Sequence, residues 1–208
     1  MPLQNRVLPD GEIVAIPERG LFTGNRGILH DPDRRTLLPR RWTSRRWIVC
    51  TRSWKGVRRP VMGGRSWTEL FFLDEATALA AGHRPCFYCR RAEARRFQAA
   101  WVAGTGGAGD ADAMDAVLHA ERLDGRAKRR HRLPGPLGEL PDGAMVAAAD
   151  GMFAIVAGRP WRWTPGGYRP APTLPDGLSL LTPPSTVRAL AAGYHPVLHP
   201  SLGAAADG

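Results

Sequence analysis

The stretch GHRPCFYC, residues Gly82–Cys89, follows a short alanine-rich helical pattern and carries two of the three cysteines of the chain. Cys86 and Cys89 are three residues apart, a spacing at which two thiolates can bind one metal ion. Cys50 lies upstream and can reach the same ion once the chain folds back. The sequence therefore predicts a zinc site with Cys50, Cys86 and Cys89 as ligands.

The fourth ligand of this site is left open by the sequence, because a closed structural zinc site has four ligands. His83 is the nearest candidate, and His30, Glu69, Asp74 or a water molecule are the others. The identity of this ligand decides whether the site is structural or reactive. The three thiols are also compatible with buried apolar side chains or a redox pair.

Length and composition set the class of protein. A chain of 208 residues with 43% hydrophobic content suits one domain or two small ones with a real core. An odd number of cysteines with one Cys-x-x-Cys pair favours reduced thiols over a disulfide framework. No apolar run is long enough to span a membrane, and MPLQNRVLPDGEIV does not resemble a signal peptide. We therefore expect a cytoplasmic protein without a membrane partner.

The basic charge is concentrated in one segment. The net charge is +10, which implies attraction to a polyanion. Residues 34–65 carry many arginines and no acidic residue, and tryptophans that can stack on bases lie among them. The alternative is an arginine-rich surface whose tryptophans belong to the core. We predict nucleic acid as the partner, DNA ahead of RNA, with contacts from Arg45, Arg46, Trp47, Arg52, Trp54, Arg58 and Arg59.

The hydrophobic and turn patterns predict an α+β fold. A glycine-rich linker, 104–113, is expected to divide a zinc-knuckle region, 1–103, from a helix followed by a β-rich region, 114–208. Asp150-Gly151 predicts a hairpin in a β-meander, and a terminal helix follows between Thr182 and Gly193. In the first region we expect strands at 12–16, 45–54 and 67–73, a helix capped by Asp74 and Gly82, and a second helix at 89–101.

The helix after the linker carries polar residues at helical spacing. His119, Glu121 and Arg122 are predicted as a catalytic group, because an imidazole, a carboxylate and a guanidinium suit acid–base or phosphate chemistry. The alternative is a solvated helix face with internal ion pairs.

The passage FFLDEATALAAGHRPCFYCRR resembles the second half of the Ada-type zinc-binding domain, in which a short helix ends in Gly, aromatic, Arg, Pro, Cys, two residues and Cys. Matching positions are Gly82, Arg84, Pro85, Cys86 and Cys89, and His83 stands where the family has an aromatic residue. A similar ending occurs in small metal-binding modules attached to nucleases. The resemblance implies a zinc knuckle and a tendency to meet DNA or RNA.

The chain departs from the Ada pattern upstream of the knuckle. The family has two upstream cysteines, one of which accepts a methyl group, whereas Cys50 is alone here. If the resemblance extends to chemistry, Cys50 is the thiolate that would take an alkyl group, and Arg46 and Arg52 would seat the phosphate.

The expected function is a zinc-containing nucleic-acid-binding protein linked to DNA repair or processing. One alternative is a metal-dependent or His/Glu-based hydrolase or transferase acting on nucleic acid or a phosphorylated ligand. Another is a zinc-stabilised protein-interaction module.

Overall fold

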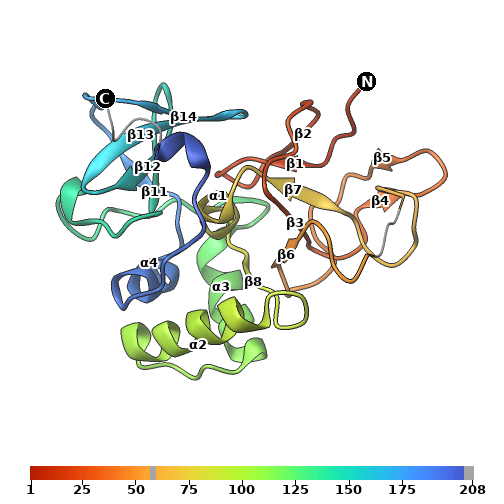
Figure 1. The fold of residues 1–208 in the computed structure, drawn as a ribbon, viewed down its shortest axis with the longest axis horizontal. Helices are drawn as coiled ribbons and strands as arrows, with labels where there is room; N and C mark the ends of the chain where they lie inside the picture. The colour runs from red at the N-terminus through yellow and green to blue at the C-terminus, as the bar shows by residue number, and fades with distance from the viewer. Residues whose placement is uncertain (57–59, 204–208) are drawn as a thin grey trace.

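The computed structural model describes residues 1–56 and 60–203, and it confirms the predicted α+β class (Figure 1). Two sheets lie at opposite ends of the molecule with helices between and below them. The helices are α1 (Glu75–Ala80), α2 (Arg91–Thr105), α3 (Ala111–Arg122) and α4 (Pro184–Ala191), with 3-10 turns at Leu137–Glu139 and Pro200–Leu202.

The N-terminal sheet is mixed and is built from short strands. Its side chains alternate, so that Val49, Leu70 and Phe72 enter a core cluster from one face while Cys50 and Phe71 point to the other. The strand order is β2 (Ile13–Val14), β1 (Arg6–Val7), β7 (Leu70–Phe72), β3 (Phe22–Asn25), β6 (Ile48–Thr51) and β8 (Arg84–Pro85), and a separate hairpin pairs β4 (His30–Asp31) with β5 (Thr36–Leu37).

The C-terminal sheet is antiparallel, with the meander that the turn pattern predicted. Ala148 pairs with Gly151 across the first turn, next to the predicted Asp150-Gly151 signal. The second turn holds Ala157 and Gly158, both with positive φ, as a type I′ hairpin requires. The strand order is β14 (Gly167–Pro170), β13 (Arg159–Thr164), β12 (Gly151–Val156), β11 (Met145–Ala148) and β15 (Ser179–Leu180), and a small hairpin pairs β9 (Leu123–Asp124) with β10 (Ala127–Lys128).

Helix α1 joins the two halves, because it contacts both β7 and β11. All six of its residues are buried. Asp74 caps its N-terminus as predicted, and the carboxylate of Asp74 accepts hydrogen bonds from Thr77 N at 2.9 Å and from the Tyr168 hydroxyl at 2.9 Å. The N-terminal sheet, through β7, and the C-terminal sheet, through β11 and Tyr168 of β14, are thus fixed to the same helix.

The core is continuous across the predicted linker. Only residues 106–110 of the 104–113 stretch lie outside helices, because α2 extends to Thr105 and α3 begins at Ala111. Trp101 of α2 and Leu118 of α3 belong to one apolar cluster together with Phe153 of the C-terminal sheet. The glycine-rich stretch therefore connects two helices that share this core.

No helix in the described part of the chain is long and apolar enough to cross a membrane.

Gly82 follows α1 at a point where the backbone lies close to the side chain of Arg122. Its φ is +88°, and a Cβ atom there would lie 2.6 Å from Cδ of Arg122. Gly82→Ala combines left-handed backbone strain with a steric clash, so we expect it to lower the free energy of unfolding by about 2–4 kcal/mol. Chemical denaturation measures this loss.

Gly106→Ala is the matched control. Gly106 also has positive φ, +66°, but a Cβ there meets no atom within 4 Å. This variant should lose only about 1 kcal/mol. Equal losses for the two variants would contradict the packing argument at Gly82.

Candidate metal centre and adjoining cavity

The three cysteines converge because of the way β6 and β8 pair. These strands are parallel, with Val49 opposite Pro85, and Cys86 N donates to Val49 O at 3.0 Å. The next residue on each strand is a cysteine, so Cys50 and Cys86 lie side by side. The Sγ atoms of Cys50, Cys86 and Cys89 all lie within 4.8 Å of one another. Tetrahedral sulfur ligands at about 2.3 Å from an ion lie about 3.8 Å apart, so these thiols are close enough together to hold one metal ion.

The thiols stabilise negative charge within the cluster. Hydrogen bonds from Cys50 and Cys89 lower the pKa of the Cys86 thiol, and the backbone N of Tyr88 donates to Cys86 Sγ at 3.4 Å. The same contacts with Cys86 and Cys89, together with burial, raise the pKa of Cys50. A cation bound by the three sulfurs would favour the loss of their protons.

Two buried ion pairs hold the chain on either side of the Cys-x-x-Cys turn. Arg84 donates to both carboxylate oxygens of Asp115, at 2.9 and 2.7 Å. Arg90 donates in the same bidentate way to Glu75, at 2.7 and 3.0 Å. All four side chains are at most 5% exposed. The turn that carries Cys86 and Cys89 is thus fixed at both ends by charged groups of α1 and α3.

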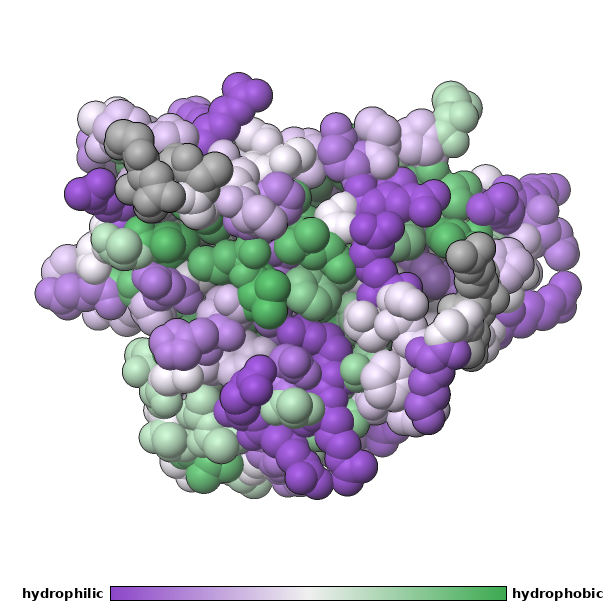
Figure 2. Space-filling model, in the orientation of Figure 1, coloured by the Kyte–Doolittle hydropathy of each residue, from purple (hydrophilic) through white to green (hydrophobic). Residues whose placement is uncertain are grey.

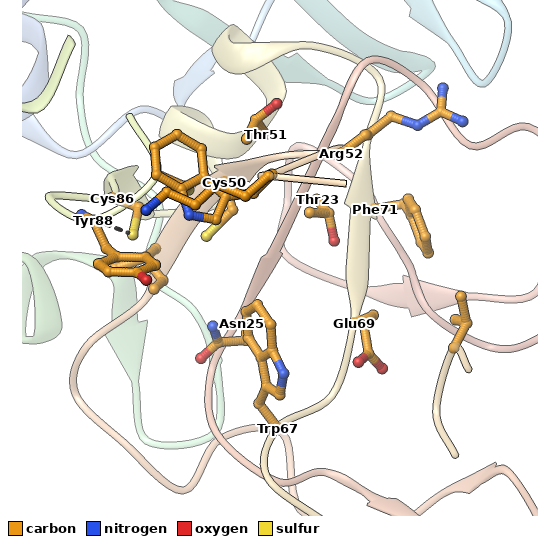
Figure 3. A pocket seen from close by; sticks show the side chains of 15 residues that line it. Thr23, Asn25, Cys50, Thr51, Arg52, Trp67, Glu69, Phe71, Cys86 and Tyr88 are labelled. Atoms are coloured by element: carbon orange, nitrogen blue, oxygen red, sulfur yellow. Dashed lines mark hydrogen bonds between the residues drawn. The ribbon is translucent and has the colours of Figure 1, made fainter. Parts of the chain in front are cut away.

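A cavity of about 470 Å³ opens directly in front of the three cysteines (Figure 3). Thr23 and Asn25 of β3, and Glu69 and Phe71 at β7, form its floor on the face of the sheet opposite the core. Trp54, Trp67 and Tyr88 are among the residues of its walls. All three cysteines of the candidate metal site line this cavity.

Each residue predicted as the fourth ligand has a hydrogen-bond partner, including Glu69, which accepts from Met62 N at 2.8 Å. His83 is fully buried, and its ring nitrogens contact Arg26 Nε and Ala78 O, both at 3.2 Å. His30 is bound to Thr68 and Gly64, and Asp74 caps α1. The prediction of His83 as a ligand is therefore corrected, because the ring is held on the core side. Glu69 alone among these candidates lines the cavity.

Trp47 is not placed to stack on a base, in contrast to the prediction. It is 3% exposed, and its ring lies between the guanidinium groups of Arg26 at 3.9 Å and Arg122 at 4.0 Å. Its Nε1 donates to Ser44 O at 3.0 Å. The indole belongs to the core, as the alternative interpretation of the tryptophans held.

The predicted catalytic group on α3 is not assembled as one site. Glu121 accepts hydrogen bonds from Ser185 N and its hydroxyl at the start of α4. Arg122 is fully buried and donates to Gly82 O and Arg45 O, and it also contacts His119 Nδ1 at 3.1 Å. Burial and Arg122 lower the pKa of His119. Glu121 and Arg122 thus serve the packing of α3, which explains why they occur on this helix.

The basic surface includes part of the predicted segment and extends beyond it. Arg45, Arg46 and Arg52 are exposed, although Arg46 forms an ion pair with Asp112 at 3.1 Å. Arg58 and Arg59 lie outside the described residues.

Figure 2 shows hydrophilic residues gathered over the lower centre, where α2 begins in Figure 1. Exposed arginines of this helix, which the prediction did not include, are Arg91, Arg95 and Arg96.

Comparisons with protein-family models, with curated proteins and with solved structures find no match to this chain.

The free energy of unfolding depends on pH through Lys128. Its Nζ donates to Ala80 O at 2.5 Å, at the end of α1, and it lies near Arg26 and Arg122. Burial, followed by the two arginines, lowers the pKa of Lys128 to about 7. Between pH 7 and pH 10 the unfolded chain binds a proton that the folded chain lacks, so a rise in pH stabilises the folded state.

The variant Lys128→Met removes this contribution to the pH dependence of stability. We expect the variant to gain stability relative to the wild type at pH 7, where the partly buried cation is costly, and to keep a smaller advantage at pH 9.5. Urea denaturation of both proteins at the two pH values measures the difference, on the order of 1 kcal/mol or more. The same pH dependence in both proteins would show that Lys128 is solvated.

Proposed function

We propose that Cys50, Cys86 and Cys89 hold one zinc ion and that the protein binds nucleic acid around this site. The observation that carries the proposal is the convergence of the three sulfurs on the wall of a ligand-sized cavity. Thiolate ligands suit zinc, and three protein ligands with an open fourth position are typical of reactive zinc sites. The open position is directed at the cavity.

The charge of the surrounding surface supports nucleic acid as the partner. The chain carries a net charge of +10, and exposed arginines flank both Cys50 and the Cys-x-x-Cys turn, namely Arg45, Arg52 and Arg91. Such groups neutralise phosphates, and their attraction does not depend on base sequence. A link to DNA repair or processing follows from the resemblance to the Ada-type knuckle, and it is part of the same proposal.

A second candidate is metal-dependent hydrolysis or group transfer at the same cavity. It is favoured by the open coordination position, which can hold a water molecule or a substrate atom. In this alternative the reaction takes place at the cysteines rather than at His119, Glu121 and Arg122, whose side chains are used in packing. Turnover of a nucleic-acid substrate by the zinc-loaded protein distinguishes this candidate from binding alone.

Metal analysis tests the zinc site. We expect about one zinc ion per purified chain, and we expect Cys86→Ser or Cys89→Ser to release it, because a hydroxyl is a much weaker zinc ligand than a thiolate. Elemental analysis and thiol titration measure metal content and free thiols. Ser53→Ala, an exposed change close to Cys50, is the control and should retain the metal. A wild-type protein with three freely titrating thiols and no metal contradicts the proposal.

The salt dependence of binding tests the nucleic-acid interface. We expect the logarithm of the association constant for duplex DNA to fall linearly with the logarithm of salt concentration, as counterions are released. The double variant Arg45→Glu/Arg52→Glu should reduce the magnitude of the slope by about 2, since each lost phosphate contact contributes about 0.9. Fluorescence anisotropy across a salt series measures both slopes.

The double variant Arg159→Glu/Arg169→Glu is the matched control. It changes the net charge by the same amount on exposed residues of the C-terminal sheet. Its slope should stay close to that of the wild type. Equal effects of the two double variants would assign the attraction to net charge and not to the surface around the cysteines.

A further inference from the structure

The cavity in front of the cysteines has the size and lining of a ligand site. Its volume of about 470 Å³ falls within the range of small-molecule pockets, and its lining is largely apolar with a few polar groups. Strand alternation creates it, because the inner face of the sheet is used for the core and the outer face for the cavity. The floor is therefore a rigid surface of paired strands.

The walls of the cavity present aromatic faces close to the metal site. The rings of Trp54 and Tyr88 lie 5.7 Å apart at an angle of 58°, and both line the cavity together with Cys86 and Cys89. Tyr88 is 72% exposed, unusually high for an aromatic side chain in a folded protein. Trp54 Nε1 is buried and has no hydrogen-bond partner among the described residues. An exposed aromatic ring and a buried indole donor therefore lie side by side on this wall.

The floor offers polar groups at the end of the cavity away from the cysteines. One oxygen of Glu69 accepts from Met62 N at 2.8 Å, and Asn25 Oδ1 accepts from Gly27 N at 3.3 Å. The other Glu69 oxygen and the Asn25 amide nitrogen have no hydrogen bond to the described residues. An acceptor and a donor thus both line the cavity, on either side of Trp67 in the view of Figure 3. A heterocycle that carries both kinds of polar group could use them.

The distance between the strands that carry Cys50 and Glu69 leaves room for one ring system in the cavity. Cys50 lies on β6 and Glu69 precedes β7, and β3 runs between these strands. Two interstrand spacings amount to about 10 Å. A planar base can therefore lie over β3, with the cysteines at one edge, Glu69 at the other, and Asn25 on β3 between them.

We propose that this cavity takes one unstacked nucleobase of a bound nucleic acid, with its ring against Trp54 and Tyr88 and its polar edge on Glu69 and Asn25. This inference rests on the proposed function and names the part of the nucleic acid that reaches the metal site. Lys55 and Arg52 line the same cavity and supply positive charge for the adjacent phosphates. A base paired in a duplex cannot enter, so the ligand is single-stranded or has the base extruded.

The test compares a short single-stranded oligonucleotide with an abasic phosphate chain of the same length. Zinc-loaded wild-type protein should bind the base-containing strand at least fivefold more tightly, because stacking on aromatic side chains adds affinity. Tyr88→Ala should lose this preference while its affinity for the abasic chain stays unchanged. Tyr88→Phe keeps the ring and should retain the preference. Tyr88 is exposed, so these changes leave the core intact.

Glu69→Gln tests the polar edge of the cavity. Replacing an acceptor-only carboxylate by an amide should change the order of affinities for the four homopolymer strands, with little change for the abasic chain. Equal affinity of wild-type protein for the two kinds of strand, or an unchanged preference in Tyr88→Ala, overturns the base-binding inference but leaves phosphate binding in place. Absence of binding to either strand at low salt overturns the proposed function itself.

Discussion

The buried ion pair between Glu75 and Arg90 is the interaction on which most of the architecture depends. Glu75 also accepts hydrogen bonds from the Tyr194 hydroxyl at 2.6 Å and from Val197 N at 2.9 Å. One carboxylate therefore connects α1, the end of the Cys-x-x-Cys turn and the C-terminal segment. A buried pair of this kind contributes little net stability by itself, but loss of one partner leaves an uncompensated charge that costs several kcal/mol. Replacement of either residue alone therefore destabilises the folded state.

The cysteine cluster and the cavity are two results of one sheet arrangement. Parallel pairing of β6 with β8 sets Cys86 beside Cys50, and alternation along β6 directs Cys50 away from the core. The same alternation along β3 and β7 directs Thr23 and Phe71 to that face. The cysteines come from distant parts of the chain, yet they lie beside the floor of the cavity on one surface.

The local features of this fold could be predicted from the sequence, and the long-range ones could not. Asp74 and Gly82 mark the ends of α1, and glycine turns mark the hairpins of the C-terminal sheet, because caps and turns depend on neighbouring residues. The three cysteines could be grouped because their chemistry is selective. The burial of Trp47 between Arg26 and Arg122 depends on residues 21 and 75 positions away, which no local pattern encodes. The cavity likewise depends on which strands become neighbours.

The two bidentate ion pairs around the Cys-x-x-Cys turn have a consequence for how the cysteine cluster could take up a metal ion. In many small zinc modules the ion organises the chain, and much of the binding energy is used for folding. Here Arg84 and Arg90 fix the turn through carboxylates of α3 and α1, and neither contact includes a thiol. The turn that carries Cys86 and Cys89 is therefore held by contacts that do not depend on the sulfur atoms. A metal ion bound by the three cysteines would enter a turn whose ends are already fixed, instead of having to organise the chain around itself.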